Sequence, residues 1–134
     1  DLTTPDEAVP VGAELRGPGD TVYALSWTGA GAVLAAASKD GVVWMWDVTN
    51  PAAPSLQSTL AAAEGTLYAV ALAADGAHVS SGGTAQSVVT WQTDPNAVAA
   101  ATCPRTGTPM TQDEWQQVAP GVAYDPPCPA PAGS

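Results

Sequence analysis

The sequence is poor in the residue types on which several common functions depend. It contains no phenylalanine, one histidine, and only 3 lysines and arginines against 13 aspartates and glutamates, for a formal net charge of −10. A phosphate-binding surface needs clustered Lys and Arg, so we expect no nucleic-acid binding and repulsion from anionic membranes. With one histidine, candidates for acid–base catalysis near neutral pH are also few.

Long apolar runs are missing too. No stretch approaches the roughly 18–20 residues of a membrane span, so we expect no direct membrane insertion by this segment, and no signal peptide is recognisable. Because the chain begins at Asp1 rather than Met, we expect it to be processed or to be a fragment of something longer. The 13 glycines and 13 prolines favour short strands and tight turns over long helices.

An internal repeat is the most informative feature that is present. The stretch TVYALSWTGAGAVLAAASKDGVVWMWDVTNP, from Thr21, aligns without a gap with TLYAVALAADGAHVSSGGTAQSVVTWQTDPN, from Thr66. Tyr23 recurs as Tyr68 and Trp46 recurs as Trp91, each 45 residues later. A gapless period of this length lies within the range of a four-stranded propeller blade.

Each repeat unit divides into short apolar segments separated by turn residues. The first unit predicts strands at residues 22–27, 32–37, 42–48 and 56–60, with an Asp-Gly turn before the third. The second unit predicts strands at residues 67–72, 77–82 and 87–91. Residues 11–15 match residues 56–60 by position, which predicts that they form the outer strand of a preceding blade.

A short motif links the repeat to a known family. The string S-x-D-G-x-V-x-x-W-D, formed by Ser38, Asp40, Gly41, Val43, Trp46 and Asp47, resembles the signature of WD-repeat β-propellers. The resemblance covers about residues 11–93. It implies an all-β fold with two four-stranded-type blades, which form part of a larger ring. Two blades cannot close a ring, so the remaining blades are expected elsewhere in the same parent protein or on another chain.

In that family, a buried hydrogen-bonded set of His, Ser or Thr, Asp and Trp joins neighbouring strands of each blade. The resemblance assigns this structural network to Ser38, Asp40, Trp46 and Trp91. The histidine position falls on Pro18 and Ala63, and the second unit has Ala85 at the aspartate position and Gln92 after its tryptophan. We therefore expect most of the polar network to be lost, with ladder hydrogen bonds and packing holding the strands.

Three tryptophans of the first unit are candidates for core or for contact with a partner. Trp44 and Trp46 are two residues apart, which places them on the same face of a strand. Trp46 is expected to pack between blades. Trp44 either shares that core or, if exposed, contacts a partner, because aromatic side chains anchor interfaces. Trp27, at the end of the first strand, is the other candidate partner contact.

The C-terminal segment differs from the repeat units. Asp94 and Pro95 predict the start of a short helix, and Thr111 and Glu114 have the spacing of a capping box for a second one near Gln112. The segment resembles the C-terminal ends of bacterial, especially actinobacterial, multi-domain WD-repeat proteins. The matching residues are Asp94, Pro95, Cys103, Gly107, Pro109, Thr111, Glu114, Trp115, Pro120, Gly121, Tyr124, Pro126, Pro127 and Cys128.

The chain therefore divides into four expected parts. Residues 1–20 are the outer strand and linker of a preceding blade, and residues 21–65 are a blade. Residues 66–93 are the last blade, whose outer strand is supplied from elsewhere, in this family usually from the N-terminal end of the propeller. Residues 94–134 are a capping tail.

Two cysteines lie in the tail, and we expect Cys103 and Cys128 to form a disulfide. Two unrelated buried thiols or a metal site are the alternatives, although the lack of a nearby histidine or a CxxC pair makes a poor zinc site. A disulfide closing this loop stabilises by about 3–4 kcal/mol in the chain-entropy model. It also implies an oxidising, extracytoplasmic location, either secreted or on the outer face of the cell membrane.

The sequence offers no catalytic constellation, cofactor motif or metal site. His78 is expected to be structural or exposed, and no Gly-Lys-Ser/Thr loop or G-x-S-x-G motif is present. The adjacent carboxylates Asp6-Glu7 and Asp113-Glu114 diverge on any regular element. We expect a non-catalytic protein-interaction or sensory scaffold within a larger extracytoplasmic protein. The alternative is part of a propeller enzyme, or a structural subunit of a larger assembly, whose active site lies on other blades or chains.

Overall fold

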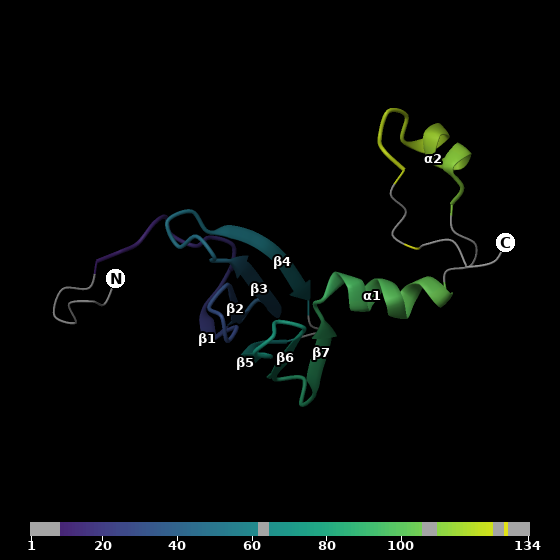
Figure 1. Cartoon of the computed structure of the whole chain (residues 1–134). Helices are drawn as coiled ribbons and strands as arrows, with labels where there is room; N and C mark the ends of the chain where they lie inside the picture. The colour runs from purple at the N-terminus through teal and green to yellow at the C-terminus, as the bar shows by residue number, and fades with distance from the viewer. Residues whose placement is uncertain (1–8, 62–64, 106–109, 125–127, 129–134) are drawn as a thin grey trace. The chain divides into compact units, whose positions relative to one another are not determined.

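The computed structural model describes residues 9–61, 65–105, 110–124 and 128 (Figure 1). Several residues from the sequence analysis lie outside these ranges, namely Asp6, Glu7, Ala63, Gly107, Pro109, Pro126 and Pro127. The chain divides into two compact units, Asp1–Thr93 and Asp94–Ser134.

The first unit contains two separate antiparallel sheets, as the repeat predicts (Figure 1). The first sheet has four strands in sequence order: β1 (Val22–Trp27), β2 (Val33–Ser38), β3 (Val42–Asp47) and β4 (Ser55–Ala61). The second has three: β5 (Leu67–Leu72), β6 (His78–Gly83) and β7 (Val88–Gln92). All seven lie within one residue of the expected bounds.

Glycine occupies equivalent turns of the two sheets. Gly31, between β1 and β2, has φ of +68°, and Gly76, its equivalent between β5 and β6, has φ of +75°. Glycine adopts positive φ without the steric cost that other residues pay. The same backbone conformation at the same repeat position keeps the strand registers equivalent in the two sheets.

The two sheets pack face to face through small and aliphatic side chains. Ala35, Ala37, Val43, Met45, Leu67 and Val79 form one buried cluster, against which Val70, Leu72 and Trp91 of the second sheet pack. Ala35 and Ala37 are fully buried, and their methyl side chains let the second sheet approach β2 closely. Burial of this apolar surface is the main favourable contribution to the contact.

The two repeat tryptophans have different neighbours. Trp91 packs against the cluster between the sheets, whereas Trp46 lies on the opposite face of the first sheet with Leu34 and Ala36. Trp46 and Trp91 occupy equivalent repeat positions, so they point in the same direction along the stack. The second sheet uses its Trp91 face to contact the first sheet, and the equivalent Trp46 face of the first sheet points away from the second. The contact between these two sheets therefore uses Trp91 and not Trp46.

The segment at residues 11–15, expected as the outer strand of a preceding blade, forms no strand within this chain. No described strand of this chain pairs with the segment, and a strand requires a hydrogen-bonded neighbour. Leu15 nevertheless packs against the cluster that contains Trp46. Its repeat equivalent, Leu60 of β4, packs in the same way against the cluster between the two sheets. The segment thus occupies the position of a fourth strand without its ladder.

The second unit consists of helices that begin where the sequence predicts. Helix α1 (Pro95–Thr102) is capped by the Asp94 side chain, which accepts a hydrogen bond from the Asn96 amide at 2.9 Å. A 3-10 turn, η1 (Cys103–Arg105), follows it. Helix α2 (Gln112–Val118) begins with the Thr111–Glu114 capping box.

A disulfide and an aromatic pair hold the rest of this unit. The expected disulfide joins Cys103 and Cys128, whose Cα atoms are 5.3 Å apart. The rings of Trp115 and Tyr124 meet edge to face at 6.2 Å. The Tyr124 hydroxyl donates to the Met110 carbonyl at 2.7 Å. Packing is sparse, because neither α1 nor α2 contains a buried residue.

Two buried serines of the first unit provide a matched pair of stability predictions. The Ser38 hydroxyl accepts from the Asp40 amide and donates to the Asp20 carbonyl, whereas the Ser81 hydroxyl is buried with no hydrogen-bond partner among the described residues. Ser38→Ala is therefore expected to lower the free energy of unfolding by about 1 kcal/mol, and Ser81→Ala to leave it unchanged or raise it by up to about 1 kcal/mol. Urea unfolding measures both. A clear loss of stability in Ser81→Ala would contradict this placement of its hydroxyl.

Reduction of the disulfide is expected to affect the second unit alone. Loss of the cross-link removes about 3–4 kcal/mol from that unit in the chain-entropy model. Hydrogen exchange with and without reductant should show faster exchange in residues 95–102 and 112–118 and no change in β2 and β6. Cys103→Ser should reproduce the reduced state. Unchanged exchange in both helices would show that the cross-link does not stabilise them.

Candidate functional site

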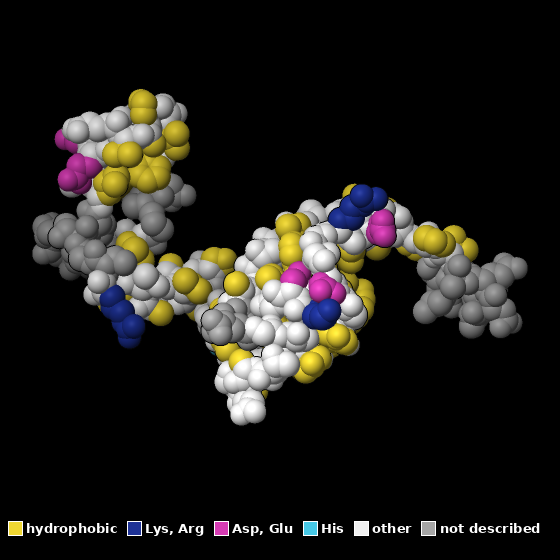
Figure 2. Space-filling model, turned by 180° about the vertical axis from the view of Figure 1, so that it is seen from behind, with side chains coloured by type: hydrophobic (Ala, Val, Ile, Leu, Met, Phe, Trp, Pro, Cys, Tyr) yellow, Lys and Arg dark blue, Asp and Glu magenta, His cyan; other side chains and the backbone are white. Residues whose placement is uncertain are grey.

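One face of the first sheet is apolar and only partly covered. We call this face, which points away from the second sheet, the tryptophan face; it carries Leu25, Trp27, Leu34, Ala36, Trp44 and Trp46. The strand registers place these residues opposite one another on β1, β2 and β3. The half over β1 is open, with Leu25 57% and Trp27 55% exposed. The space-filling view shows hydrophobic side chains in yellow at the surface of the molecule (Figure 2).

The N-terminal segment, residues 9–20, covers the other half of the tryptophan face. Leu15 packs beside Trp44 and Trp46, and the Trp46 indole donates to the Arg16 carbonyl at 3.4 Å. Gly17 lies so close to Trp44 that a Cβ there would be 2.5 Å from the indole ring. Its φ of +148° also disfavours other residues. The segment buries Trp46 to 4% exposure and leaves Trp27 open.

Asp40 fastens this segment to the sheet. Its carboxylate accepts hydrogen bonds from the Gly19 amide at 2.9 Å, the Val42 amide at 3.0 Å and the Trp44 indole at 3.2 Å. Partial burial acts to raise the pKa of Asp40, but these bonds and one with Ser38 together outweigh it, so the pKa lies below its usual value. The carboxylate is thus held in its charged form and joins the N-terminal segment, the turn and β3.

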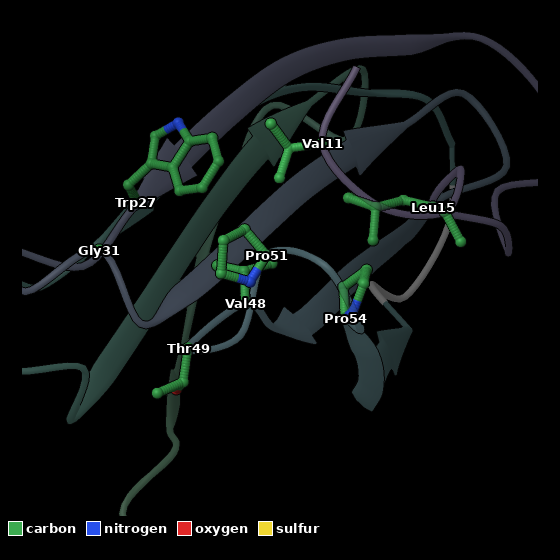
Figure 3. A pocket seen from close by; sticks show the side chains of 9 residues that line it. Val11, Leu15, Trp27, Gly31, Val48, Thr49, Pro51 and Pro54 are labelled. Atoms are coloured by element: carbon green, nitrogen blue, oxygen red, sulfur yellow. The ribbon is translucent and has the colours of Figure 1, made fainter. Parts of the chain in front are cut away.

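A pocket of about 440 Å³ opens beside Trp27 (Figure 3). The N-terminal segment, the end of β1 and the loop from β3 to β4 contribute its lining: Val11, Ala13, Leu15, Trp27, Gly31, Val48, Thr49, Pro51 and Pro54. Only Thr49 carries a polar side chain, so the pocket suits an apolar group. The lining contains no titratable side chain that could act as an acid, base or nucleophile.

The structure brings together only part of the network assigned from sequence. Ser38 and Asp40 are joined directly, since the Asp40 amide donates to the Ser38 hydroxyl at 3.3 Å. The indole that bonds to Asp40 belongs to Trp44 and not to Trp46, because Trp44 lies nearer to the turn that carries Asp40. Trp91 lies in the second sheet and does not take part. Trp44 is therefore a half-buried, fixed residue, and Trp27 is the open one.

Features associated with catalysis or metal binding are sparse. His78 begins β6 and is exposed on the face of the second sheet that points away from the first. Within the part of the chain that the structure describes, no group of three or more His, Cys, Asp or Glu residues could hold a metal ion. Cys103 and Cys128 are joined to each other, which removes both thiols as nucleophiles or ligands.

Two stacked antiparallel sheets that lie 45 residues apart in the sequence, the second packed through its apolar face on the first, are of the propeller-blade type. Residues 10–47 match the family model for the WD domain, G-beta repeat, so the chain contains a WD40 repeat there. Such repeats generally mediate protein–protein interaction or scaffolding and are typically non-catalytic. A search of curated proteins found no match.

Among the described residues, no helix combines the length and apolar character needed to cross a membrane.

Two features of the site were missed from sequence. The role of Gly17 against Trp44 carries no motif, because any glycine in a loop looks alike. The pocket depends on how the N-terminal segment lies over the sheet. The sequence contains its lining residues, among them Pro51, Pro54 and Leu15. It does not indicate that they meet around Trp27.

Asp40→Asn is expected to lower the free energy of unfolding at neutral pH by about 1 kcal/mol, because it weakens charge-assisted hydrogen bonds. The folded-state pKa is lowered, so the contribution of Asp40 is present above pH of about 4 and is lost as the pH falls through the folded-state pKa. The difference between variant and wild type in urea unfolding should shrink accordingly in acid. Asp47→Asn is the comparison, because the Asp47 carboxylate accepts from the Thr49 amide at 2.8 Å, two residues away in its own turn, and it should lower the free energy of unfolding less than Asp40→Asn. If the loss in free energy of unfolding caused by Asp40→Asn were as large in acid as at neutral pH, the charged Asp40 carboxylate would not be its source.

Proposed function

We propose that this chain is a non-catalytic segment of a WD-repeat β-propeller and acts as a protein-interaction or sensory scaffold within a larger extracytoplasmic protein. The single observation that carries the proposal is the open half of the tryptophan face, where Leu25 and Trp27 stay more than half exposed beside an apolar pocket. An exposed apolar surface next to an apolar pocket is typical of a binding site. The WD40 repeat at residues 10–47 supports the same function.

The first partners we propose are the remaining propeller blades. Residues 1–20 belong in this proposal to a preceding blade, residues 21–65 and 66–93 to two blades, and residues 94–134 to a capping tail. Leu15 already packs where the fourth strand of a preceding blade would lie. The second sheet has three strands against four in the first, so its outer strand would come from elsewhere.

The extracytoplasmic location rests on the disulfide. A Cys103–Cys128 bond persists in an oxidising compartment and is compatible with the outside of the cell. The acidic balance of the chain, at −10, supports our further expectation that it binds neither nucleic acid nor anionic lipid. The tail pattern supports placement at the C-terminal end of a bacterial WD-repeat protein.

A quantitative pull-down with the whole chain as bait tests the interaction function. The double variant Leu25→Ser/Trp27→Ser should lose the proteins that the wild type retains, since it removes apolar area from the open half of the face. Val88→Ser, on an even more exposed apolar residue of the second sheet, should retain them. Identical sets of proteins with both variants, or substrate turnover by the chain, would contradict the proposal and favour the propeller-enzyme or structural-subunit alternatives.

A further inference from the structure

A second apolar surface lies in the tail, on the segment that the disulfide encloses. We call residues 110–124 the tail lobe; in sequence they lie between Cys103 and Cys128, and they include helix α2. Val118 and Val122 of this lobe are 72% and 53% exposed. The space-filling view shows a yellow patch over α2 with acidic side chains in magenta at its edge (Figure 2). The lobe therefore leaves much of its apolar surface in contact with water.

A small set of contacts gathers the lobe around one tryptophan. The Trp115 ring meets the Tyr124 ring edge to face at 6.2 Å, and the Trp115 indole donates to the Val122 carbonyl at 3.2 Å. The Tyr124 hydroxyl donates to the Met110 carbonyl at 2.7 Å. Val118 comes three residues after Trp115, so the two side chains are neighbours on α2. The segments before and after the helix are thus drawn to the same aromatic pair.

The disulfide is needed to keep this arrangement, because the lobe lacks a core. Helix α2 has seven residues and no buried one, and a helix this short is marginal in water by itself. The bond between Cys103 and Cys128 holds the two ends of the segment together. A thiol reductant converts the two sulfurs to thiols and is itself oxidised to a disulfide. The apolar surface should therefore be present in the oxidised chain and be lost on reduction.

Negative charge is held in place beside the apolar side chains. The Glu114 carboxylate accepts hydrogen bonds from the Thr111 amide at 2.7 Å and the Thr111 hydroxyl at 2.9 Å. These bonds outweigh desolvation and hold the pKa of Glu114 below its usual value, so the carboxylate is charged at neutral pH. Val118 comes four residues after Glu114, on the same side of α2. Asp113 adds a second exposed carboxylate to this helix.

The charge of the chain decides which partner fits this surface. The chain has 13 acidic residues against 3 basic ones, and two of the basic residues, Arg16 and Lys39, already form ion pairs with Glu14 and Asp20. A second copy would bring a formal charge of −10 to a surface bordered by carboxylates, and such like-charge contact is unfavourable. A protein segment whose apolar side chains are flanked by Lys or Arg complements both the apolar surface and its acidic border.

We propose that the tail lobe is a docking surface for a basic amphipathic segment of another protein, and that the disulfide maintains this surface. Apolar side chains of the partner cover Val118 and Val122. Its Lys or Arg side chains face Asp113 and Glu114. The lobe belongs to the second compact unit, so this interaction goes beyond the one proposed for the tryptophan face and does not rest on it.

Titration of the whole oxidised chain with a synthetic peptide, followed by NMR, tests the proposal. The probe is an amphipathic helical peptide of Leu and Lys, and its control has Glu in place of every Lys. Salt at about 0.15 M screens non-specific attraction between the basic peptide and the acidic chain. The Lys peptide should shift the signals of residues 110–122, including the Trp115 indole N–H, and the Glu peptide should not. Reduction with a dithiol should weaken binding of the Lys peptide by about tenfold or more.

Variants of the lobe separate its apolar and charged contributions. Val118→Ser/Val122→Ser should weaken binding of the Lys peptide by about tenfold or more, because it removes apolar area that the peptide covers. Val98→Ser is the matched control, since Val98 is 42% exposed on α1, outside the disulfide loop, and it should bind like the wild type. Asp113→Asn/Glu114→Gln should weaken binding by about threefold or more and reduce its dependence on salt. Gln at position 114 still suits the capping box, so α2 is retained.

The proposal is overturned if the Lys peptide shifts no signal of residues 110–122, if the Glu peptide binds as well, or if reduction leaves binding unchanged. Full binding by Val118→Ser/Val122→Ser would overturn it too, provided that the cross-peaks between Trp115 and Tyr124 show a folded lobe. If that variant loses the lobe, Val118→Ser alone takes its place. Leu25→Ser/Trp27→Ser should bind the Lys peptide like the wild type, and loss of binding there would assign the peptide to the tryptophan face instead.

Discussion

The close approach of the second sheet to the small-residue face of the first is the contact on which the rest of the structure depends. Neither sheet buries enough apolar surface alone to be stable in water. Ala35 and Ala37 provide a flat, methyl-lined surface, and Val79 and Leu67 complete a dry cluster against it. Because the contact covers the face of the first sheet that carries Ala35 and Ala37, the opposite face, with Trp44 and Trp46, is left without a neighbouring sheet.

That remaining face is where the proposed function lies. Asp40 and Gly17 hold the N-terminal segment over Trp44 and Trp46, which become part of the core. The same segment stops short of Trp27, so that an indole, an apolar pocket and an open glycine turn stay accessible together.

Much of the fold could be predicted from sequence because its signals are local. Alternation and turn glycines located the seven strands, and side-chain caps at Asp94 and Thr111 located both helices. Residues 11–15 were predicted as a strand and are not one, since the partner that would pair with them is not part of the sheets described. The bond from Asp40 to Trp44 rather than Trp46, and the pocket, depend on how segments meet in space, which a repeat of 45 residues does not specify.

Nuclear Overhauser contacts between methyl groups test the central claim most directly. We expect cross-peaks from the Val79 methyls to those of Ala35, Ala37 or Val43 across the two sheets, and from the Leu15 methyls to the Trp46 indole on the other face. Cross-peaks from Val79 to Trp46, or none between β6 and the first sheet, would contradict the stacking that leaves the tryptophan face without a neighbouring sheet.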